Sequence, residues 1–228
     1  MIYAFLRWLM RVVVRIYLLG GLFEVNGLEN VPRTGGLIIC PNHSATLDPP
    51  LVPAIVPRSD TWSMAKSEYF NGGIVDFLFR HYHAFPVVRH SADRVAMRRS
   101  FEILETGDGL IMYPEGTRIE SGMLAEPERG AGFIAQRSKC LVVPVALTGT
   151  RECFPKGAKW PKRVRVSITF GKPYRIARHW PDGTRVTLED ASAAIMLSIS
   201  ELLPERQRGA FSDLEGLRER LAGAALRD

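Results

Sequence analysis

Short apolar runs alternate with segments of helical pattern along most of this chain. The apolar runs have the length of strands and are rich in β-branched or aromatic side chains; they are residues 37–40, 62–65, 84–88, 110–113, 141–147 and 164–170. Helical patterning marks the segments 72–79, 92–105, 132–137, 187–203 and 212–226. Strands that alternate with helices favour crossover connections. This order predicts an α/β fold with a mixed, mainly parallel sheet covered by helices.

The N-terminal segment is strongly apolar but carries Arg7, Arg11 and Arg15. Arginines four residues apart form one stripe on a helix, and they interrupt the run of about 18 apolar residues that a spanning helix needs. A cleaved signal peptide is disfavoured for the same reason. We therefore expect an interfacial membrane helix over residues 1–24, its arginines facing anionic phosphates, and one domain over residues 25–228. A helix packed against the core is the alternative.

The charge balance favours anionic partners. The formal net charge is +6, and ten Lys or Arg between residues 151 and 185 stand against two acidic residues. This basic segment is a candidate surface for phosphates or lipid headgroups, with a solvated strand-and-loop surface as the alternative. Nucleic acid is not expected as a partner, because the sequence has neither a nucleic-acid motif nor interleaved aromatic residues.

Cysteine and histidine spacing gives no sign of a metal site or a disulfide framework. The three cysteines show no CxxC spacing, which is typical of small buried side chains in a reducing, cytoplasmic setting. His81 and His83 lie two residues apart, but no further His, Cys or acidic residues complete a ligand set. We therefore expect no metal ion and no bound cofactor.

The segment Asn42-His43-Ser44-Ala45-Thr46-Leu47-Asp48 follows an apolar run and precedes two prolines. A turn between a strand and a helix lets the chain fold back, so that the Asp48 carboxylate can hold one nitrogen of the His43 imidazole. Histidine is largely neutral near pH 7, and its other nitrogen can then act as a general base. The alternative is that Asp48 only caps a helix beginning at Pro49 and that His43 is a polar turn residue.

A second polar loop, Tyr113-Pro114-Glu115-Gly116-Thr117-Arg118, follows another apolar run. Gly116 lets the backbone come close to a ligand, and the guanidinium of Arg118 suits a phosphate. Arg89 also comes directly after an apolar run. Loops at the carboxyl ends of strands meet where open α/β sheets bind ligands, so these groups are expected to share one crevice with His43. Surface ion pairs are the alternative for each arginine.

Four segments resemble the motifs of the glycerolipid acyltransferase family, of which bacterial 1-acylglycerol-3-phosphate acyltransferases are typical. They are residues 42–48, 85–89, 113–118 and 142–145, and their order and spacing agree with the family over residues 25–172. The second motif departs from the family pattern. Ala84 and Val88 stand where a glycine and a polar residue are common, which bears on the acceptor more than on the reaction.

The resemblance implies an O-acyltransferase. His43, oriented by Asp48, would deprotonate the free hydroxyl of lysophosphatidic acid, which would attack the thioester of acyl-CoA or acyl-carrier protein and give phosphatidic acid in phospholipid synthesis. Backbone N–H groups near Gly116 or in the segment 143–145 would stabilise the oxyanion. The resemblance also implies a set of substrate-binding residues, in which the arginines hold the phosphate and the glutamate braces the loop: Lys66, Arg89, Glu115, Gly116, Thr117 and Arg118.

Two alternatives remain at this point. Within the same class, the acceptor is another lysolipid, such as a lyso-aminolipid or a lysophospholipid with a larger headgroup. In a different class, the chain is a non-catalytic protein that binds lipid surfaces through its basic residues. Each predicts a peripheral or monotopic protein on the cytoplasmic face of the cell membrane.

Overall fold

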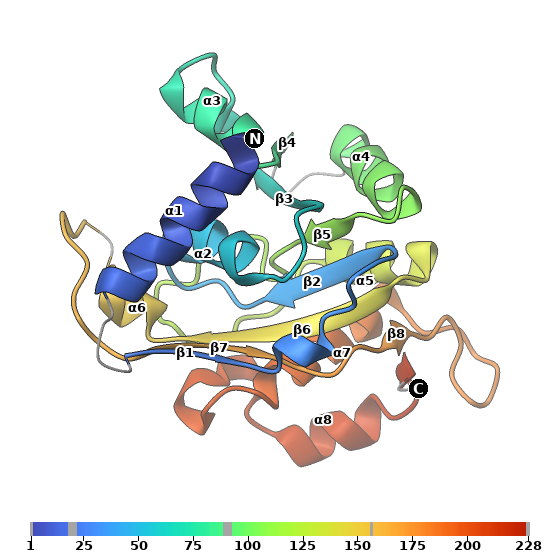
Figure 1. The fold of residues 1–228 in the computed structure, drawn as a ribbon. Helices are drawn as coiled ribbons and strands as arrows, with labels where there is room; N and C mark the ends of the chain where they lie inside the picture. Colours follow the sequence, from blue (N-terminus) through green and yellow to red (C-terminus); the bar gives the residue numbers. More distant parts are fainter. Residues whose placement is uncertain (1, 18–21, 89–92, 156, 227–228) are drawn as a thin grey trace.

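A seven-stranded sheet forms the centre of the molecule (Figure 1). The computed structural model describes residues 2–17, 22–88, 93–155 and 157–226. The strands are β1 (Phe23–Asn26), β2 (Leu37–Pro41), β3 (Thr61–Lys66), β4 (Ala84–Val87), β5 (Gly109–Ile111), β6 (Leu141–Thr148) and β7 (Val166–Phe170), in the order β1-β7-β6-β2-β5-β3-β4. Neighbours are parallel except β6 and β7. The expected mixed, mainly parallel α/β fold is confirmed.

Helices cover both faces of this sheet (Figure 1). They are α1 (Ile2–Tyr17), α2 (Asp48–Ile55), α3 (Ile74–His81), α4 (Arg94–Glu105), α5 (Arg129–Ser138), α6 (Thr150–Cys153), α7 (Leu188–Ser200) and α8 (Leu214–Arg220). Short 3-10 turns lie at Leu28–Asn30, Ser67–Tyr69, Glu205–Gln207 and Gly209–Phe211. A small second sheet pairs β8 (Arg175–Ile176) with β9 (Ala225–Leu226).

Successive side chains of a strand point to opposite faces of the sheet, so the molecule has one hydrophobic core on each face. In β2, Leu37 and Ile39 face α1 and α2, whereas Ile38 and Cys40 face the layer of α4, α5 and α7. All four side chains are fully buried. Such continuous apolar runs are typical of parallel strands covered on both faces, which is why the sequence predicted the central strands well.

The two ends of the domain differ from expectation. The last helix ends at Arg220, and Ala225–Leu226 forms a strand against β8 instead of a further helical turn. At the other end, Phe23–Asn26 is an additional strand, which pairs with β7 and was not predicted. The expected boundary between residues 24 and 25 therefore falls inside β1.

The N-terminal helix α1 directs the guanidinium groups of Arg7 and Arg11 toward α2, against expectation. They donate to the carbonyls of Val56 and Ala54 at the carboxyl end of α2. Cations satisfy the unpaired carbonyls at a helix end, so α2 supplies the anionic partner that was expected from lipid. Arg7 is 6% exposed, so the prediction that it faces outward is wrong, whereas Arg11 and Arg15 remain exposed.

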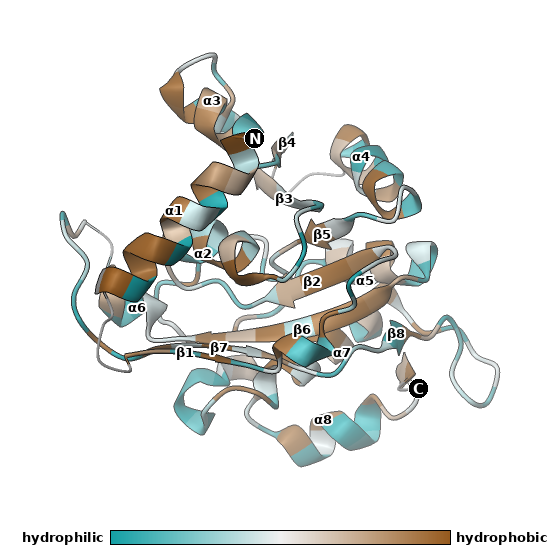
Figure 2. Cartoon of the chain, viewed as in Figure 1, coloured by the Kyte–Doolittle hydropathy of each residue, from teal (hydrophilic) through white to brown (hydrophobic). Residues whose placement is uncertain are grey.

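Most of the exposed side chains of α1 are apolar, and the ribbon of this helix is largely brown in Figure 2. Its exposed apolar residues are Ile2, Phe5, Trp8, Leu9, Val13 and Ile16. Within the described residues, the helices are all too short or too polar to cross a membrane.

Candidate active site

The candidate site lies at one edge of the sheet, where several parallel strands end. His43 follows β2, Lys66 ends β3, and the loop 113–118 follows β5. Because β2, β3 and β5 run in the same direction and are neighbours, these three positions meet at one edge. Arg89 follows β4 in the sequence but lies outside the described residues.

His43 and Asp48 form a buried pair. The Nδ1 atom of His43 lies 2.9 Å from Oδ2 of Asp48, and the two residues are 5% and 0% exposed. The backbone N–H groups of Ser44 and Ala45 donate to the same carboxylate oxygen at 2.8 and 2.7 Å. Three donors thus converge on one oxygen, which holds Nδ1 in its protonated form and leaves Nε2 with its lone pair.

The helix-cap alternative for Asp48 does not describe this geometry. Asp48 is the first residue of α2, and the preceding Leu47 occupies the cap position without a side-chain bond to the helix. The carboxylate of Asp48 bonds backward to the turn that carries His43. Its contacts therefore fix the imidazole and the turn rather than the helix end.

The loop after β5 holds the main chain of His43 on both sides. The backbone N–H of His43 donates to Oε2 of Glu115 at 2.7 Å, and the N–H of Ile119 donates to the carbonyl of His43 at 2.9 Å. Glu115 is 5% exposed. The two loops that the sequence placed at neighbouring strand ends are thus bonded directly to each other.

Burial sets the proton affinity of Glu115. The pKa of Glu115 is raised to about 7, mainly by loss of solvent and to a smaller extent by the charge of Asp48, while the N–H groups of His43 and Ala125 act in the opposite direction. The carboxyl group therefore changes its protonation near neutral pH while in contact with the main chain of His43.

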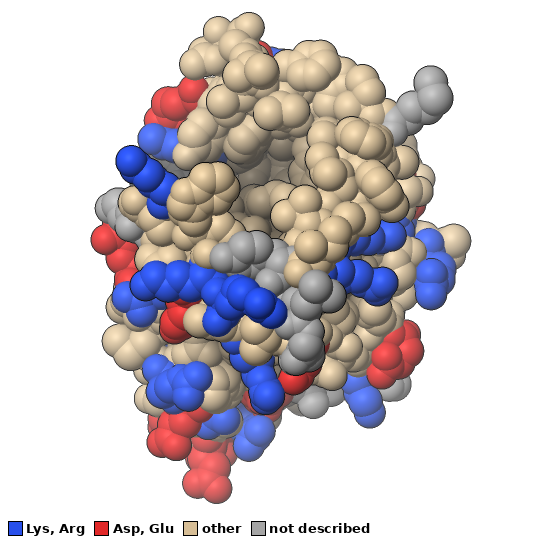
Figure 3. All heavy atoms as spheres, turned by 60° about the vertical axis from the view of Figure 1, so that its left-hand side comes forward, with Lys and Arg blue, Asp and Glu red and all other residues tan. Residues whose placement is uncertain are grey.

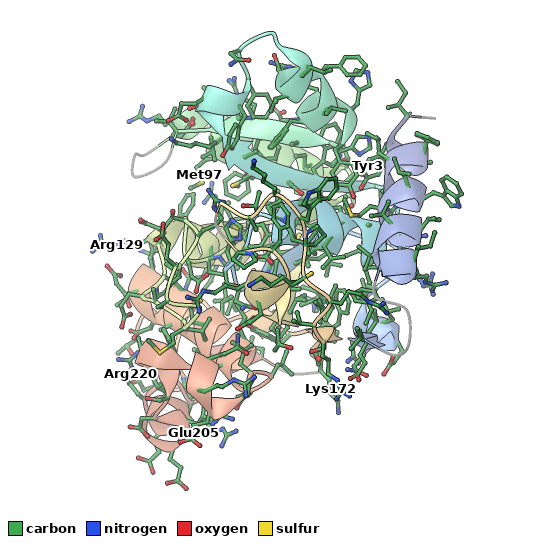
Figure 4. The ribbon with its side chains drawn as sticks, turned by 90° about the vertical axis from the view of Figure 1, so that its left-hand side faces the viewer. Tyr3, Met97, Arg129, Lys172, Glu205 and Arg220 are labelled. Carbon is green, nitrogen blue, oxygen red and sulfur yellow. The ribbon has the colours of Figure 1, made fainter. Side chains whose placement is uncertain are left out.

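A cavity of about 1620 Å³ opens at this edge and contains His43 in its wall. It runs between α1 on one side and α4 and α5 on the other, and Figure 3 shows a hollow bounded mostly by uncharged side chains, with Lys and Arg gathered below it. In Figure 4, Tyr3 on α1 lies on one side of the view, and Met97 and Arg129 lie on the other. The apolar wall includes Leu6, Met10, Met97, Phe101 and Phe133.

Two predicted cationic residues face this cavity. Arg118 lines it and donates from Nη1 to Oγ1 of Thr46, which belongs to the turn between His43 and Asp48. Lys66 also lines the cavity, and its Nζ lies 2.8 Å from Oε1 of Glu68. A phosphate next to His43 would therefore find two cations already at the cavity wall.

Gly116 and Thr117 complete the loop. Gly116 has φ +68°, and a Cβ atom there would approach Cγ of Glu128 to 2.7 Å, so glycine is required by both backbone and space. Gly116 lines the cavity. The role of Thr117 as a substrate contact stays a prediction.

A family model described as Acyltransferase matches residues 22–148, more than half of the chain. The chain belongs to the acyltransferase family. The matched segment contains the His43–Asp48 pair, the loop 113–118 and the strands β1 to β6 that position them. The resemblance inferred from the sequence motifs is confirmed.

Relatives agree with this assignment. The 1-acyl-sn-glycerol-3-phosphate acyltransferase of Bacillus subtilis (strain 168) is 27% identical over 195 residues, covering 84% of this chain and 91% of that protein. A protein of the same name from Streptococcus pneumoniae is 28% identical over 179 residues, covering 78% of this chain and 64% of that protein. The crystal structure of the 1-acyl-sn-glycerophosphate acyltransferase of Thermotoga maritima superimposes with a TM-score of 0.67 at 24% identity, over 86% of this chain and 78% of that one. The structural match shows the fold.

This acyltransferase also uses Asn42, to which sequence reasoning gave no role. The Nδ2 atom of Asn42 donates to the carbonyl of Leu147 at 3.1 Å, and the N–H of Leu147 donates to Oδ1 of Asn42 at 2.7 Å. This two-way bridge joins the ends of β2 and β6 one residue before His43. Its place beside the histidine was visible in the sequence, but its partner, 105 residues away, was not.

Tyr113 is a second residue of the acyltransferase site that sequence reasoning left without a role. Its ring packs against the His43 imidazole, with ring centroids 4.3 Å apart. Together with the Asp48 carboxylate, this contact restricts rotation of the imidazole.

The segment 143–145 lies inside β6, as the apolar run predicted, and Pro144 is in register with Cys40 in the sheet. The N–H of Gly116 donates to the carbonyl of Tyr113 at 3.0 Å within the turn. The source of oxyanion donors therefore stays a prediction. The described part of this acyltransferase contains no group of three His, Cys, Asp or Glu side chains that could hold a metal ion.

Proposed function

We propose that this acyltransferase moves a fatty acyl group from acyl-CoA or acyl-carrier protein to the free hydroxyl of lysophosphatidic acid, giving phosphatidic acid. The observation that carries the proposal is the His43–Asp48 pair at 2.9 Å in the wall of a largely apolar cavity that Arg118 and Lys66 also line. The names of the relatives support the same acceptor.

The chemistry requires one base and no covalent intermediate. Nε2 of His43 takes the proton of the acceptor hydroxyl as its oxygen attacks the thioester carbonyl. Asp48 holds Nδ1–H and stabilises the imidazolium that forms. The C–S bond then breaks, and the thiolate takes the proton back from Nε2. The acyl thioester is a co-substrate, and the reaction as written needs no bound cofactor.

The cations would hold the acceptor phosphate. The Arg118 guanidinium is fixed to Thr46, within the turn that also carries His43, so the phosphate and the hydroxyl of one acceptor can be bound together. Lys66 adds a point charge from the neighbouring strand end. Arg89 is assigned to the same phosphate from its sequence position, and Glu115 and Gly116 shape the loop that presents Arg118.

The exposed apolar residues support a membrane-bound enzyme. The outer face of α1 leaves large side chains in solvent, and α3 adds Ile74, Val75, Phe77 and Leu78. Contiguous exposed apolar surface of this kind is typical of membrane contact, and the cavity opens beside α1. Our proposal therefore includes a peripheral or monotopic attachment to the cell membrane, with the cytoplasmic face expected from the sequence.

Acyl transfer by the purified full chain tests the proposal. With lysophosphatidic acid and either oleoyl-CoA or oleoyl-acyl-carrier protein, His43→Ala should lower kcat by about 10²–10⁴-fold, the usual contribution of a general base. His81→Ala is the matched control, because His81 is outside the described cavity wall and bonds to the carbonyl of Phe77. Unchanged turnover in His43→Ala contradicts the assignment of the base.

A competition between acceptors tests the substrate. Lysophosphatidic acid should be acylated in preference to a lyso-aminolipid that lacks a phosphate, because the phosphate engages Arg118 and Lys66. Preference for the phosphate-free acceptor rules out these roles. Vesicle binding without any thioester consumption by the wild-type protein would identify a lipid-binding protein instead.

A further inference from the structure

The connection between α6 and β7 exposes a tryptophan among lysines. Trp160 is 81% exposed, and the neighbouring Lys159 and Lys162 are exposed as well. An indole ring is large and mostly apolar, so its full exposure at a loop tip has a cost in water. Tryptophan next to cations is the combination that favours the interface of an anionic bilayer, where the ring and the charges are both stabilised.

The base of this loop is closed, which gives its tip a defined place. The N–H of Lys162 donates to the carbonyl of Cys153 at 2.6 Å, and the N–H of Ala158 donates to the carbonyl of Pro155 at 3.0 Å. Cys153 is itself buried, 2% exposed, at the end of α6. These hydrogen bonds hold the base of the loop in place, so the position of its tip is defined.

The same loop belongs to the edge of the sheet that carries the site. It follows β6, and at its start Oγ1 of Thr150 lies 3.5 Å from Oγ of Ser44, the residue after His43. At its other end, the N–H of Val166 donates to the carbonyl of Leu22 at 2.7 Å, just after α1 in the sequence. In Figure 1 the loop rises beside the end of α1. The residues that flank this loop thus lie beside the turn of His43 on one side and beside the segment that follows α1 on the other.

We propose that Trp160, with Lys159 and Lys162, is a second membrane contact that binds anionic lipid headgroups beside α1. The proposal rests on the membrane placement given under the proposed function. Insertion of α1 alone would leave the molecule free to rotate about the helix axis. A second contact at the same edge of the sheet would restrict that rotation and hold the cavity toward the lipid from which the acceptor comes.

Charge and side-chain type favour lipid over an acidic protein partner. An acidic protein would need cations alone, whereas the tip presents its most exposed large apolar side chain between them. The strand that follows the loop is also bonded to Leu22, a few residues after the apolar helix α1 ends. Lipid accounts for both surfaces together.

Vesicle binding by the full chain tests the proposal. The double variant Lys159→Ala/Lys162→Ala should bind phosphatidylcholine vesicles that contain phosphatidylglycerol more than about tenfold less tightly, since each cation near an anionic surface contributes about fivefold. Trp160→Ala should weaken binding to vesicles with and without phosphatidylglycerol. The matched control is Arg206→Ala/Arg220→Ala, which removes two exposed charges and should change binding by less than about twofold. Arg220 and Glu205, the neighbour of Arg206 in the sequence, lie at the lower end of the molecule in Figure 4.

Tryptophan fluorescence gives an independent measurement. Brominated lipids quench indoles that lie within the bilayer, and the chain has only four tryptophans. Part of the quenching of the wild-type protein should be lost in Trp160→Phe. Equal quenching in the two proteins, or equal vesicle affinity in the lysine variant and the control, overturns the proposal.

The outcomes separate this proposal from the proposed function. Vesicle binding is measured without substrate, so it stands even if the chain transfers no acyl group. All loop variants should keep the wild-type rate with a short-chain, water-soluble lysophosphatidic acid. Unchanged vesicle binding with a raised KM for acyl-carrier protein alone would identify the tip as a surface for an acidic protein and would refute the lipid assignment.

Discussion

Glu115 accepts a hydrogen bond from the backbone N–H of His43 at 2.7 Å, although 72 residues separate them in the sequence. Asp48 holds the side chain of the same histidine, and the N–H of Ile119 holds its carbonyl. The imidazole is therefore positioned from both polar loops, 42–48 and 113–118. A displacement of the loop 113–118 is expected to move His43 as well as Arg118.

Replacement of Asp48 by Asn should preserve the fold and lower turnover. An amide oxygen can still accept from Ser44 and Ala45, but it carries no charge to stabilise the imidazolium. We expect kcat to fall by at least about 10²-fold with little change in KM. Steady-state kinetics with a thermal melt checks both parts. Asp76→Asn, a similar change in a carboxylate that bonds to Arg80 and Gly72, is the control, and equal kcat in the two variants contradicts the assignment.

Protein stability should depend on pH through Glu115. Burial raises the pKa of Glu115 to about 7 from an ordinary value of 4.5, so the folded chain holds this proton more tightly than the unfolded chain. The resulting stabilisation is complete below about pH 4.5 and is lost as pH rises through about 7. Glu115→Gln cannot titrate, and its amide nitrogen cannot accept from an N–H. The difference in stability between the wild type and the variant should therefore favour the wild type most at low pH.

Thermal melts of the wild type and Glu115→Gln across this pH range measure the effect. The difference between their melting temperatures should shrink steadily as the solution passes from mildly acidic to mildly alkaline. A difference that stays constant with pH would show that the carboxyl group of Glu115 does not titrate in this window.

Replacement of Asn42 by Ala should destabilise the site edge. The N–H and the carbonyl of Leu147 would both lose their partner in a fully buried position. Each unpaired buried group costs about 1–3 kcal/mol of unfolding free energy. Urea denaturation measures the loss, and Asn71→Ala, which removes an exposed side chain bonded to Gly73, is the control. Similar stability in both variants would show that the bridge contributes little.

Replacement of Arg7 by Met should loosen α1. The guanidinium of Arg7 donates to the carbonyl of Val56, and hydrogen bonds to charged groups contribute about 1.5–3 kcal/mol. We expect a lower melting temperature and faster proteolysis near the N-terminus. Arg15→Met makes the same chemical change at an exposed position of the helix and should leave both unchanged. A stronger effect in Arg15→Met would contradict the inward orientation.

The central strands could be predicted because their burial depends on local pattern. Val142 to Leu147 is apolar at every position, as a strand covered on both faces requires, and β6 extends from Leu141 to Thr148. The strand β1 could not be predicted in this way. It has four residues and alternating burial, and it is held in place by pairing with β7, whose other side is paired with β6.

The orientation of α1 shows the limit of helical periodicity. The spacing of Arg7 and Arg11 correctly placed them on one side of a helix. Which side faces the protein depends on the carbonyls of Ala54 and Val56, and these become available only where α2 ends. No local pattern in residues 1–24 contains that information.

The site could be predicted in its residue types but not in its contacts. His43, Asp48 and the loop 113–118 were visible as polar segments after apolar runs, since parallel strands bring their carboxyl ends together. The bond from His43 to Glu115 and the bridge from Asn42 to Leu147 join distant parts of the chain through main-chain atoms. Main-chain partners leave no trace in side-chain identity, so only the structure reveals them.

If α1 lies in a bilayer as proposed, the hydrogen bonds from Arg7 and Arg11 to α2 have a consequence for how the molecule would leave it. If the body detached and the helix stayed behind, two guanidinium groups would lose their carbonyl partners near hydrocarbon, and the two carbonyls at the end of α2 would lose their donors. The helix and the body are therefore expected to leave the bilayer together, without partial unfolding.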